Sequence, residues 1–311
     1  MGTDNKLTAR ATFVFGEPLQ FFDQFDALET LESPLNANLL TLRANLLSGL
    51  RVGTIPYQLV QSGVFSRRFN QLIIAEKIRC RTKVEIGEIT EDQIEDTAIR
   101  IAKQRMDEEI NSPDGIERQA TQALAELDHH LSDNGFRTSA QELLRQILIM
   151  GWGAFEIFVS DLLKTLINEY PKLITEFAEV KPYRDFLSSR LLMDALQARN
   201  FDLSTCMGDI FAEAVKLDSL EKIRDALRIG LGDPSVDILL KDERLWKLSQ
   251  QRHLIVHRRG IVDRSYFGRT SDRFAVGDYL TVDAAYVEDS LALVRDIGCQ
   301  LFIVAHEKLR K

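Results

Sequence analysis

The segment from Arg252 to Asp263 brings together two side-chain types that phosphate chemistry needs. It reads Arg-His-Leu-Ile-Val-His-Arg-Arg-Gly-Ile-Val-Asp. An Arg guanidinium stays charged and presents a planar fork of donors to a phosphate. A His imidazole exchanges its proton near neutral pH. Arg252 and His257 are therefore candidates for stabilising charge and moving a proton at a phosphodiester.

Two other interpretations of this segment involve no phosphate chemistry. Near a helix C-terminus, His257, Arg258 and Arg259 would be favoured by the helix dipole and by the last free carbonyl groups before Gly260. Arg252 could equally be an ion-pair residue on a surface or between helices. The spacing alone is weak evidence, because an Arg followed five positions later by a His is common in an Arg-rich chain.

Metal binding is a third reading, since His253 and His257 lie four positions apart, on one face of a helix. Leu254, however, stands where the metalloprotease pattern HExxH needs its Glu, and no other His-rich segment offers a third ligand. We expect no metal and no cofactor; an acidic third ligand is the alternative.

Helix geometry separates Arg252 from His257 within one chain. Residues five apart on a straight helix differ by roughly 140° in azimuth, so the two side chains of one copy do not converge. Two antiparallel copies of the helix around a two-fold axis could bring both pairs into one cleft. The motif therefore favours a homodimer formed through its own helix.

The second half of the sequence shows helical apolar spacing and helix-end signals throughout. Ser139 and Glu142 have the spacing of a capping box, and an apolar stripe continues from there until Tyr170-Pro171. Gly260 is expected at the C′ position of the motif helix, and Gly277-Asp278 marks a turn. Further helices are predicted over residues 173–179, 183–198, 204–214, 220–229, 242–259 and 283–309.

The first half is less regular. Residues 21–50 have helical apolar spacing interrupted by Pro34, and helices are predicted over 94–110 and 116–131. The β-branched residues of Leu72–Cys80 and Lys83–Ile89 indicate a short strand pair. A polar stretch, 128–137, suggests a boundary between domains 1–135 and 136–311. The expected fold is mainly α, a C-terminal helical bundle with an N-terminal helical or α+β domain.

Charge is distributed unevenly along this chain of 311 residues with a net charge of −8. That sign argues against coating nucleic acid through the overall field. Residues 244–273, however, carry eight Lys or Arg against two acidic residues, while residues 85–110 carry nine acidic residues against three basic ones. Both runs could be solvated helix faces. Alternatively, residues 244–273 form an anion-binding site, and the acidic residues 85–110 mask it in the resting state.

Composition argues against a membrane-spanning, secreted or disulfide-linked protein. With 45% hydrophobic and 28% charged residues the chain is typical of a soluble globular protein. The apolar run 147–159 is too short to span a bilayer, and the N-terminus lacks the order of a secretion signal, so we expect a cytoplasmic protein with no membrane partner. The three cysteines are far apart without CxxC spacing, which favours buried free thiols.

Glu156 stands in an otherwise apolar stretch, where an unpaired carboxylate would be costly. Either it holds Arg252 or His253 in place, or it faces solvent from an uncovered side of the helix.

The segment from Arg252 to Asp263 resembles the motif of the HEPN superfamily, which is written RN..VH..G.VD in a common variant. Arg252 matches the Arg, His253 the following polar position and His257 the motif His, with Gly260 and Asp263 behind them. The family more often carries Asn or Asp at the place of His253. The stretch from Gly153 to Leu163 resembles the first core helix of these domains, and the resemblance covers about residues 137–311.

The resemblance implies a helical bundle that dimerises through the motif helix. It also implies a metal-independent endoribonuclease of toxin–antitoxin systems or phage defence, with RNA as substrate and an antitoxin or regulatory protein as partner. His257 would act as general base or acid, Arg252 would stabilise the pentavalent anion, and His253 would orient the substrate or share the proton. The supporting residues would be Glu156, Arg258, Arg259 and Asp263. The alternatives are a non-catalytic RNA-binding or regulatory HEPN module and a helical dimeric scaffold.

Overall fold

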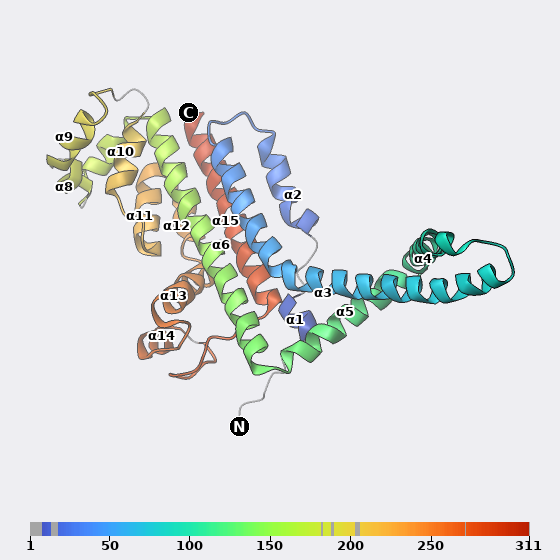
Figure 1. Ribbon diagram of the computed structural model, residues 1–311. Helices are drawn as coiled ribbons and strands as arrows, with labels where there is room; N and C mark the ends of the chain where they lie inside the picture. The colour runs from blue at the N-terminus through green and yellow to red at the C-terminus, as the bar shows by residue number, and fades with distance from the viewer. Residues whose placement is uncertain are drawn as a thin grey trace. The chain divides into compact units, whose positions relative to one another are not determined.

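The computed structural model consists of α-helices and their connections (Figure 1). It describes residues 8–13, 18–181, 183–187, 190–202, 206–270 and 272–310. Within these ranges there is no β-strand, and one isolated β-bridge joins Ile261 and Tyr279. The prediction of a mainly α fold is confirmed. The helices are α1 (Ala9–Phe13), α2 (Pro18–Glu29), α3 (Asn36–Glu85), α4 (Ile94–Asn111), α5 (Gly115–Leu131), α6 (Asn134–Glu169), α7 (Leu173–Ala178), α8 (Tyr183–Leu187), α9 (Arg190–Gln197), α10 (Met207–Ala214), α11 (Leu220–Leu231), α12 (Pro234–Leu239), α13 (Glu243–Arg258), α14 (Arg264–Arg269) and α15 (Ala284–Leu309), with a 3-10 turn at Glu91–Gln93.

The chain forms two compact units. Unit 1 comprises Met1–Val14 and Gly53–Ala140, and unit 2 comprises Phe15–Val52 and Gln141–Lys311. A single division near residue 135 is therefore wrong for the segment 15–52. That segment belongs to unit 2 because the apolar side chains of the first part of α3, among them Leu39, Leu42 and Leu46, are fully buried in its core.

The core of unit 2 lies between α15, α6 and the first part of α3, which run side by side (Figure 1). Small residues allow their close approach. A Cβ added at Gly298 of α15 would lie 2.4 Å from a methyl carbon of Leu42, and one added at Gly151 of α6 would lie 2.6 Å from Leu291. Aromatic residues of α6, including Phe155 and Phe158, fill the space between the helices and are completely buried. This core holds the helix that carries the motif.

The longest apolar helix, α6, begins earlier than expected. It starts at Asn134, where the Asp133 carboxylate accepts a hydrogen bond from the backbone N–H of Phe136 at 2.8 Å. The predicted capping box at Ser139 is wrong, since the Ser139 hydroxyl donates to the carbonyl of Gly135 inside the helix. Among the described helices, α6 alone has the length and composition of a membrane span, and 56% of its most apolar window is buried inside the protein.

Unit 1 is built from α1, the second part of α3, α4 and α5. The predicted strand pair is wrong, because residues 72–85 continue α3. Leu72, Glu76 and Cys80 are buried at every fourth position, which is the repeat of a helical face. Pro56 lies within α3 and has no N–H, so the carbonyl of Val52, four residues earlier, loses its intrahelical hydrogen bond.

Ion pairs join the helices of unit 1 to one another. Glu76, whose side chain is 3% exposed, pairs with Arg79 of its own helix and with Arg105 of α4 at 2.9 Å. Three further pairs tie α3 to α4 or α5, namely Arg68–Glu109, Lys77–Glu95 and Arg67–Glu126. The apolar clusters of this unit are small by comparison, one around Phe13 and Leu127 and one around Met106.

Most predicted helices of the second half are confirmed, with shifts of a few residues at their ends. The predicted helix 183–198 corresponds to α8 and α9, and residues 188–189 between them lie outside the described residues. The predicted helix 204–214 corresponds to α10, with residues 204–205 also outside them. Sequence analysis missed α12 and α14, which have six residues each and are too short to show a periodic pattern.

Candidate active site on helix α13

Helix α13 has one buried side and one exposed side. Its N-cap is Asp242, whose carboxylate accepts a hydrogen bond from the backbone N–H of Arg244 at 2.8 Å. Five residues anchor the buried side: Leu245, Leu248, Gln251, Leu254 and Ile255. His253, Val256 and His257 are left exposed, and Arg252 is half-buried. The apolar residues between the motif positions thus fix the rotation of the helix.

Arg252 forms an ion pair with α6. Its Nη2 lies 3.6 Å from Oε2 of Glu156, and the two side chains are 29% and 23% exposed. Of the two alternatives for Glu156, the structure shows the contact with Arg252 and records none with His253. Since Glu156 lies on a core helix, it restrains the guanidinium on the side of α13 that faces α6.

The two histidines of the motif lie against each other. The ring centroids of His253 and His257 are 4.5 Å apart, with an angle of 48° between the ring planes. Both side chains are exposed, and neither forms a hydrogen bond or ion pair with another described residue. Their ring nitrogens are therefore open to solvent or to a substrate.

Three of the expected supporting residues have structural roles. Arg259 ends α13 in the left-handed conformation (φ +55°), and Gly260 follows at C′ with φ +77°, as predicted. Asp263 caps α14 by accepting a hydrogen bond from the backbone N–H of Tyr266 at 2.8 Å. Its other oxygen lies 3.6 Å from Nε of Arg258. Arg259 thus ends the motif helix through its backbone, whereas the cap by Asp263 belongs to α14 and was not anticipated from the sequence.

Two polar residues of α6 that sequence analysis missed hold the loop after the motif. Arg145 donates a hydrogen bond to the carbonyl of Leu280 at 3.1 Å, although its side chain is only 5% exposed. Gln141 exchanges two hydrogen bonds with the backbone of Val282. A Cβ on Gly260 would approach Arg145 to 3.0 Å. In the sequence, the four-residue spacing of Gln141 and Arg145 on an apolar helix could have indicated that both side chains lie on one buried face.

A second missed group of polar residues lies between α13, α14 and α15. The Tyr286 hydroxyl donates to the buried side-chain oxygen of Gln251 at 2.8 Å. The Tyr266 hydroxyl donates to Asp272, whose other oxygen lies 3.2 Å from Nζ of Lys247. Burial, together with the hydrogen bond to Asp272, raises the pKa of Tyr266. Burial alone would raise the pKa of Asp272, but the bonds from Tyr266 and Lys247 outweigh it and lower that pKa. Tyr266 therefore stays protonated and Asp272 ionised near neutral pH.

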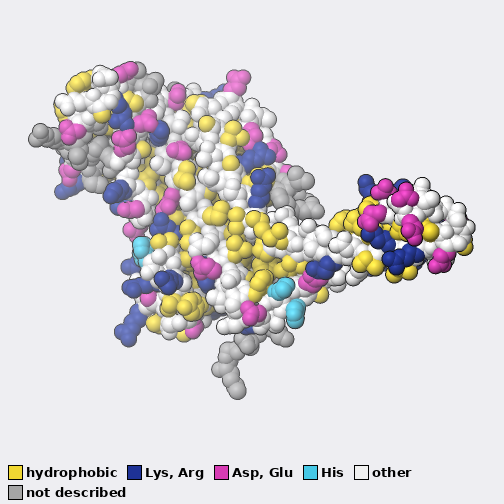
Figure 2. All heavy atoms as spheres, viewed as in Figure 1, with side chains coloured by type: hydrophobic (Ala, Val, Ile, Leu, Met, Phe, Trp, Pro, Cys, Tyr) yellow, Lys and Arg dark blue, Asp and Glu magenta, His cyan; other side chains and the backbone are white. Residues whose placement is uncertain are grey.

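Four arginines at this end of unit 2 have no ion pair among the described residues. We call them the basic surface: Arg259, Arg264, Arg269 and Arg273. All four are exposed. Figure 2 shows Lys and Arg side chains (dark blue) gathered at the lower left, over α13 and α14, with a His side chain (cyan) beside them. Asp263 and Asp272, the acidic residues of the same segment, are already paired. The local charge is therefore available to an anion.

The chemistry open to this arrangement is proton transfer and anion stabilisation. Within the described ranges, no three His, Cys, Asp or Glu side chains are grouped so that they could hold a metal ion. Arg252 faces α6 while the His253–His257 pair lies on the exposed side, so one copy of α13 does not focus all three side chains on one point.

Comparison of the chain with descriptions of protein families, with curated proteins and with solved structures found no match.

Proposed function

We propose that the protein is a metal-independent endoribonuclease whose active site contains two copies of α13, one from each chain of a homodimer. The observation that carries the proposal is the pair of exposed, unbonded imidazoles of His253 and His257, one helical turn apart, beside an Arg that a carboxylate restrains. The resemblance to HEPN domains favours a cytoplasmic role in a toxin–antitoxin system or in phage defence. An antitoxin or regulatory protein would then be its protein partner.

The reaction is an internal transfer at phosphorus. His257 accepts the proton of the RNA 2′-hydroxyl, whose oxygen attacks the adjacent phosphorus. The bond from phosphorus to the 5′-oxygen breaks, and that oxygen takes a proton from an imidazolium. Arg252 stabilises the negative charge of the five-coordinate intermediate. The products are a 2′,3′-cyclic phosphate and a 5′-hydroxyl. His253 orients the substrate or shares the proton with His257.

The exposed face of α13 supports the homodimer. Val256 is 47% exposed and lies one turn after Arg252, so both belong to one face of the helix. Ile157, also 47% exposed, follows Glu156 on α6. Apolar side chains next to a paired Arg and Glu are suited to an isologous contact, in which the same patch of each copy meets itself. The basic surface would hold the RNA backbone on either side of the cleft.

Cleavage of single-stranded RNA by the full chain, in chelator, tests the proposal. Arg252→Ala and His257→Ala should each lower the rate by about 100-fold or more, the size of effect that a general base or an anion-stabilising group contributes. His253→Ala should have a smaller effect. Arg244→Ala is the matched control, because Arg244 lies on the same helix but pairs with Asp242 at the opposite end. Sedimentation checks that every variant remains a dimer, and the cleaved ends are analysed for the cyclic phosphate.

Glu156→Gln tests the ion pair. The amide keeps the shape of the side chain but loses the charge that restrains Arg252. The rate of cleavage should fall about three- to tenfold, an effect of roughly 1 kcal/mol, the upper end of what a partly exposed ion pair contributes. Full activity and full stability in this variant would show that Glu156 does not position Arg252.

The other outcomes separate the alternatives. RNA binding without cleavage, lost in the same variants, would favour a regulatory RNA-binding module. If an intact dimer neither binds nor cleaves RNA, the remaining alternative is the helical dimeric scaffold. The quickest first observation is growth of cells that express the chain, since toxicity relieved by His257→Ala is expected of a ribonuclease.

A further inference from the structure

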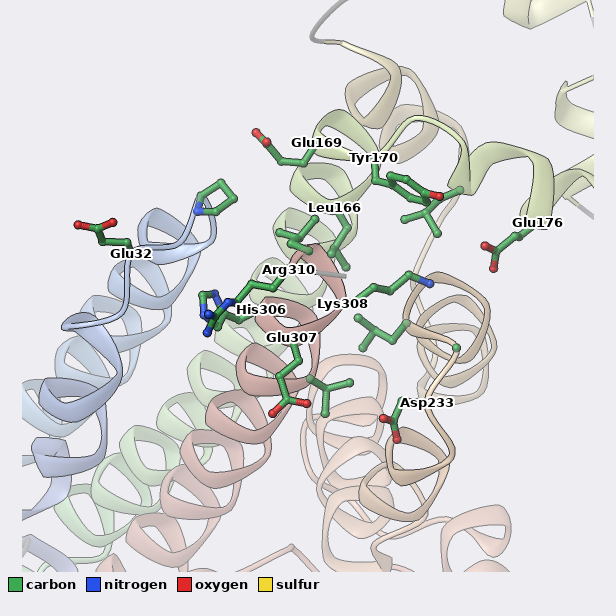
Figure 3. Close-up of a pocket in the computed structure, with 16 residues that line it drawn as sticks. Glu32, Leu166, Glu169, Tyr170, Glu176, Asp233, His306, Glu307, Lys308 and Arg310 are labelled. Carbon is green, nitrogen blue, oxygen red and sulfur yellow. The ribbon is translucent and has the colours of Figure 1, made fainter.

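A cavity of about 750 Å³ lies in unit 2, away from α13, around the C-terminal end of α15. Figure 3 shows the side chains that line it, which come from the α2–α3 turn, the end of α6, α7, the α11–α12 turn and α15. Its volume falls within the range of about 300–1,000 Å³ that is usual for small-molecule sites. Nothing in the proposed ribonuclease uses it.

The rim of this cavity is acidic. Five of its lining residues are acidic, against two that carry a positive charge, Lys308 and Arg310. Four of the acidic residues form no hydrogen bond or ion pair with any described side chain: Glu32, Glu169, Glu176 and Glu307. The acidic groups around the opening therefore outnumber the basic ones, which favours a cation.

The floor of the cavity is apolar. Leu166 and Leu173 are fully buried, and Leu231 is 4% exposed. Tyr170, which is 46% exposed, adds an aromatic ring at the edge, and such a ring attracts a cation over its face. A ligand that fits both parts carries positive charge on an aliphatic body, which distinguishes it from a hydrated metal ion.

His306 provides an independent sign of a missing ligand. It lines the cavity on α15 and is 9% exposed, with its ring parallel to that of Phe302. Its buried Nδ1 has no hydrogen-bond partner among the described residues. Buried polar atoms are nearly always satisfied, so an unpaired ring nitrogen beside a cavity points to a group that binds there.

We propose that this cavity binds a linear aliphatic polyamine. The methylene segments would lie on the leucine floor, the ammonium groups would reach the carboxylates of the rim and the face of Tyr170, and one amine would satisfy Nδ1 of His306. The site is separate from α13, and the proposal does not depend on the ribonuclease activity.

Titration calorimetry of the full chain with spermidine tests the proposal. We expect saturable binding with a Kd on the order of 10–100 µM at low salt. The double variant Glu169→Gln, Glu176→Gln should weaken binding at least tenfold, because it removes two carboxylates of the rim. Lys308→Gln should strengthen binding, because it removes a like charge. His306→Phe keeps an aromatic ring against Phe302 but no ring nitrogen, and should weaken binding about threefold or more at unchanged melting temperature.

A matched control changes the same charge elsewhere in unit 2. Glu221→Gln with Glu243→Gln removes two carboxylates from α11 and α13, outside the cavity, and should leave the Kd unchanged. Equal weakening by the control and the rim variant would mean general attraction to an acidic protein and would overturn the proposal. Absence of saturable binding by the unaltered chain would do the same. Binding retained in His257→Ala would show that the two sites are independent.

Discussion

The two units hold their helices together in different ways. In unit 2 a continuous apolar core surrounds α6 and α15, and the basic surface is free of ion pairs among the described residues. In unit 1 the apolar clusters are small, and the pairs Arg68–Glu109, Lys77–Glu95 and Arg67–Glu126 connect one helix to the next. Charge therefore contributes to assembly in unit 1, whereas the four arginines of the basic surface in unit 2 are available for a ligand.

This difference shows that the net charge of a sequence segment does not reveal whether its charged side chains pair within the protein or remain free. The acidic run 85–110 and the basic run 244–273 are opposite in sign and equal in net size. In the structure, Glu95 and Glu109 of the acidic run are engaged inside unit 1. That the acidic helix masks the basic surface stays a prediction, and RNA cleavage unchanged after removal of residues 85–110 would contradict it.

The largest effect is expected in the core of unit 2. Phe158→Ala empties a completely buried site where the ring packs near Gly298 of α15. The free energy of unfolding should fall by about 3–5 kcal/mol, the usual cost of removing a buried aromatic ring. Urea unfolding followed by circular dichroism measures it. A loss below about 1 kcal/mol would show that the apolar core does not dominate unit 2.

A slightly smaller effect is expected from the buried carboxylate of unit 1. Arg79→Ala together with Arg105→Ala leaves Glu76 buried without a cation, which should cost about 3 kcal/mol of unfolding free energy. Adding Glu76→Gln to this double variant should restore part of the loss, because the uncompensated charge disappears. If the triple variant is as unstable as the double, the cost arises from packing of the arginines and not from charge.

The third prediction concerns RNA and the basic surface. Arg264→Gln, Arg269→Gln and Arg273→Gln together should weaken binding of single-stranded RNA about 10- to 100-fold at low salt and flatten its salt dependence, since each lost phosphate contact reduces the number of released counterions. The matched control removes three cations from unit 1, Arg81→Gln, Lys83→Gln and Arg100→Gln. If both triple variants lose the same affinity, the two units do not differ in their use of charge.

The smallest effect is expected at the surface of unit 1. Arg68→Ala removes the partner of Glu109, and both side chains are more than a third exposed, so the cost should be below about 1 kcal/mol. The hydrogen bond from Arg68 lowers the pKa of Glu109 below its ordinary value of 4.5. The pair therefore contributes stability above pH 4.5, and the contribution is lost as the pH falls through the lowered pKa of the folded state. Unfolding curves should show a larger difference in stability between variant and parent at pH 7 than at pH 3.

Sequence patterns sufficed for α4, α5, α6, α13 and α15, because their apolar repeats are regular and their ends carry Gly, Asn or Asp, but they missed the full length of α3. They failed at residues 72–89, where β-branched side chains indicated strands. Ile74 and Ile78 are in fact exposed on α3, and the buried residues of that stretch recur every four positions. Tertiary packing of a long helix thus overrode local strand propensity.

The candidate site was partly accessible from the sequence. The positions of Arg252, His253 and His257 on one helix, and the contact of Arg252 with Glu156, could be anticipated from periodicity and from the cost of an unpaired carboxylate. The roles of Arg145, Gln251 and Tyr286 could not, because each acts through a partner at least 35 residues away in the chain. Such contacts depend on how the helices pack, which local spacing does not encode.

Unit 2 is formed by two separate stretches of the chain, and this arrangement affects how the gene could change during evolution. The chain leaves unit 2 along α3 after Val52 and returns along α6 at Gln141, and the two helices are in contact there, since a Cβ on Gly49 would lie 3.5 Å from Ile147. Residues 53–140 thus interrupt unit 2 in the sequence, and they form unit 1 together with Met1–Val14. Such a segment can be exchanged, lengthened or shortened between related genes while unit 2 keeps its core, so that the two units can diverge at different rates.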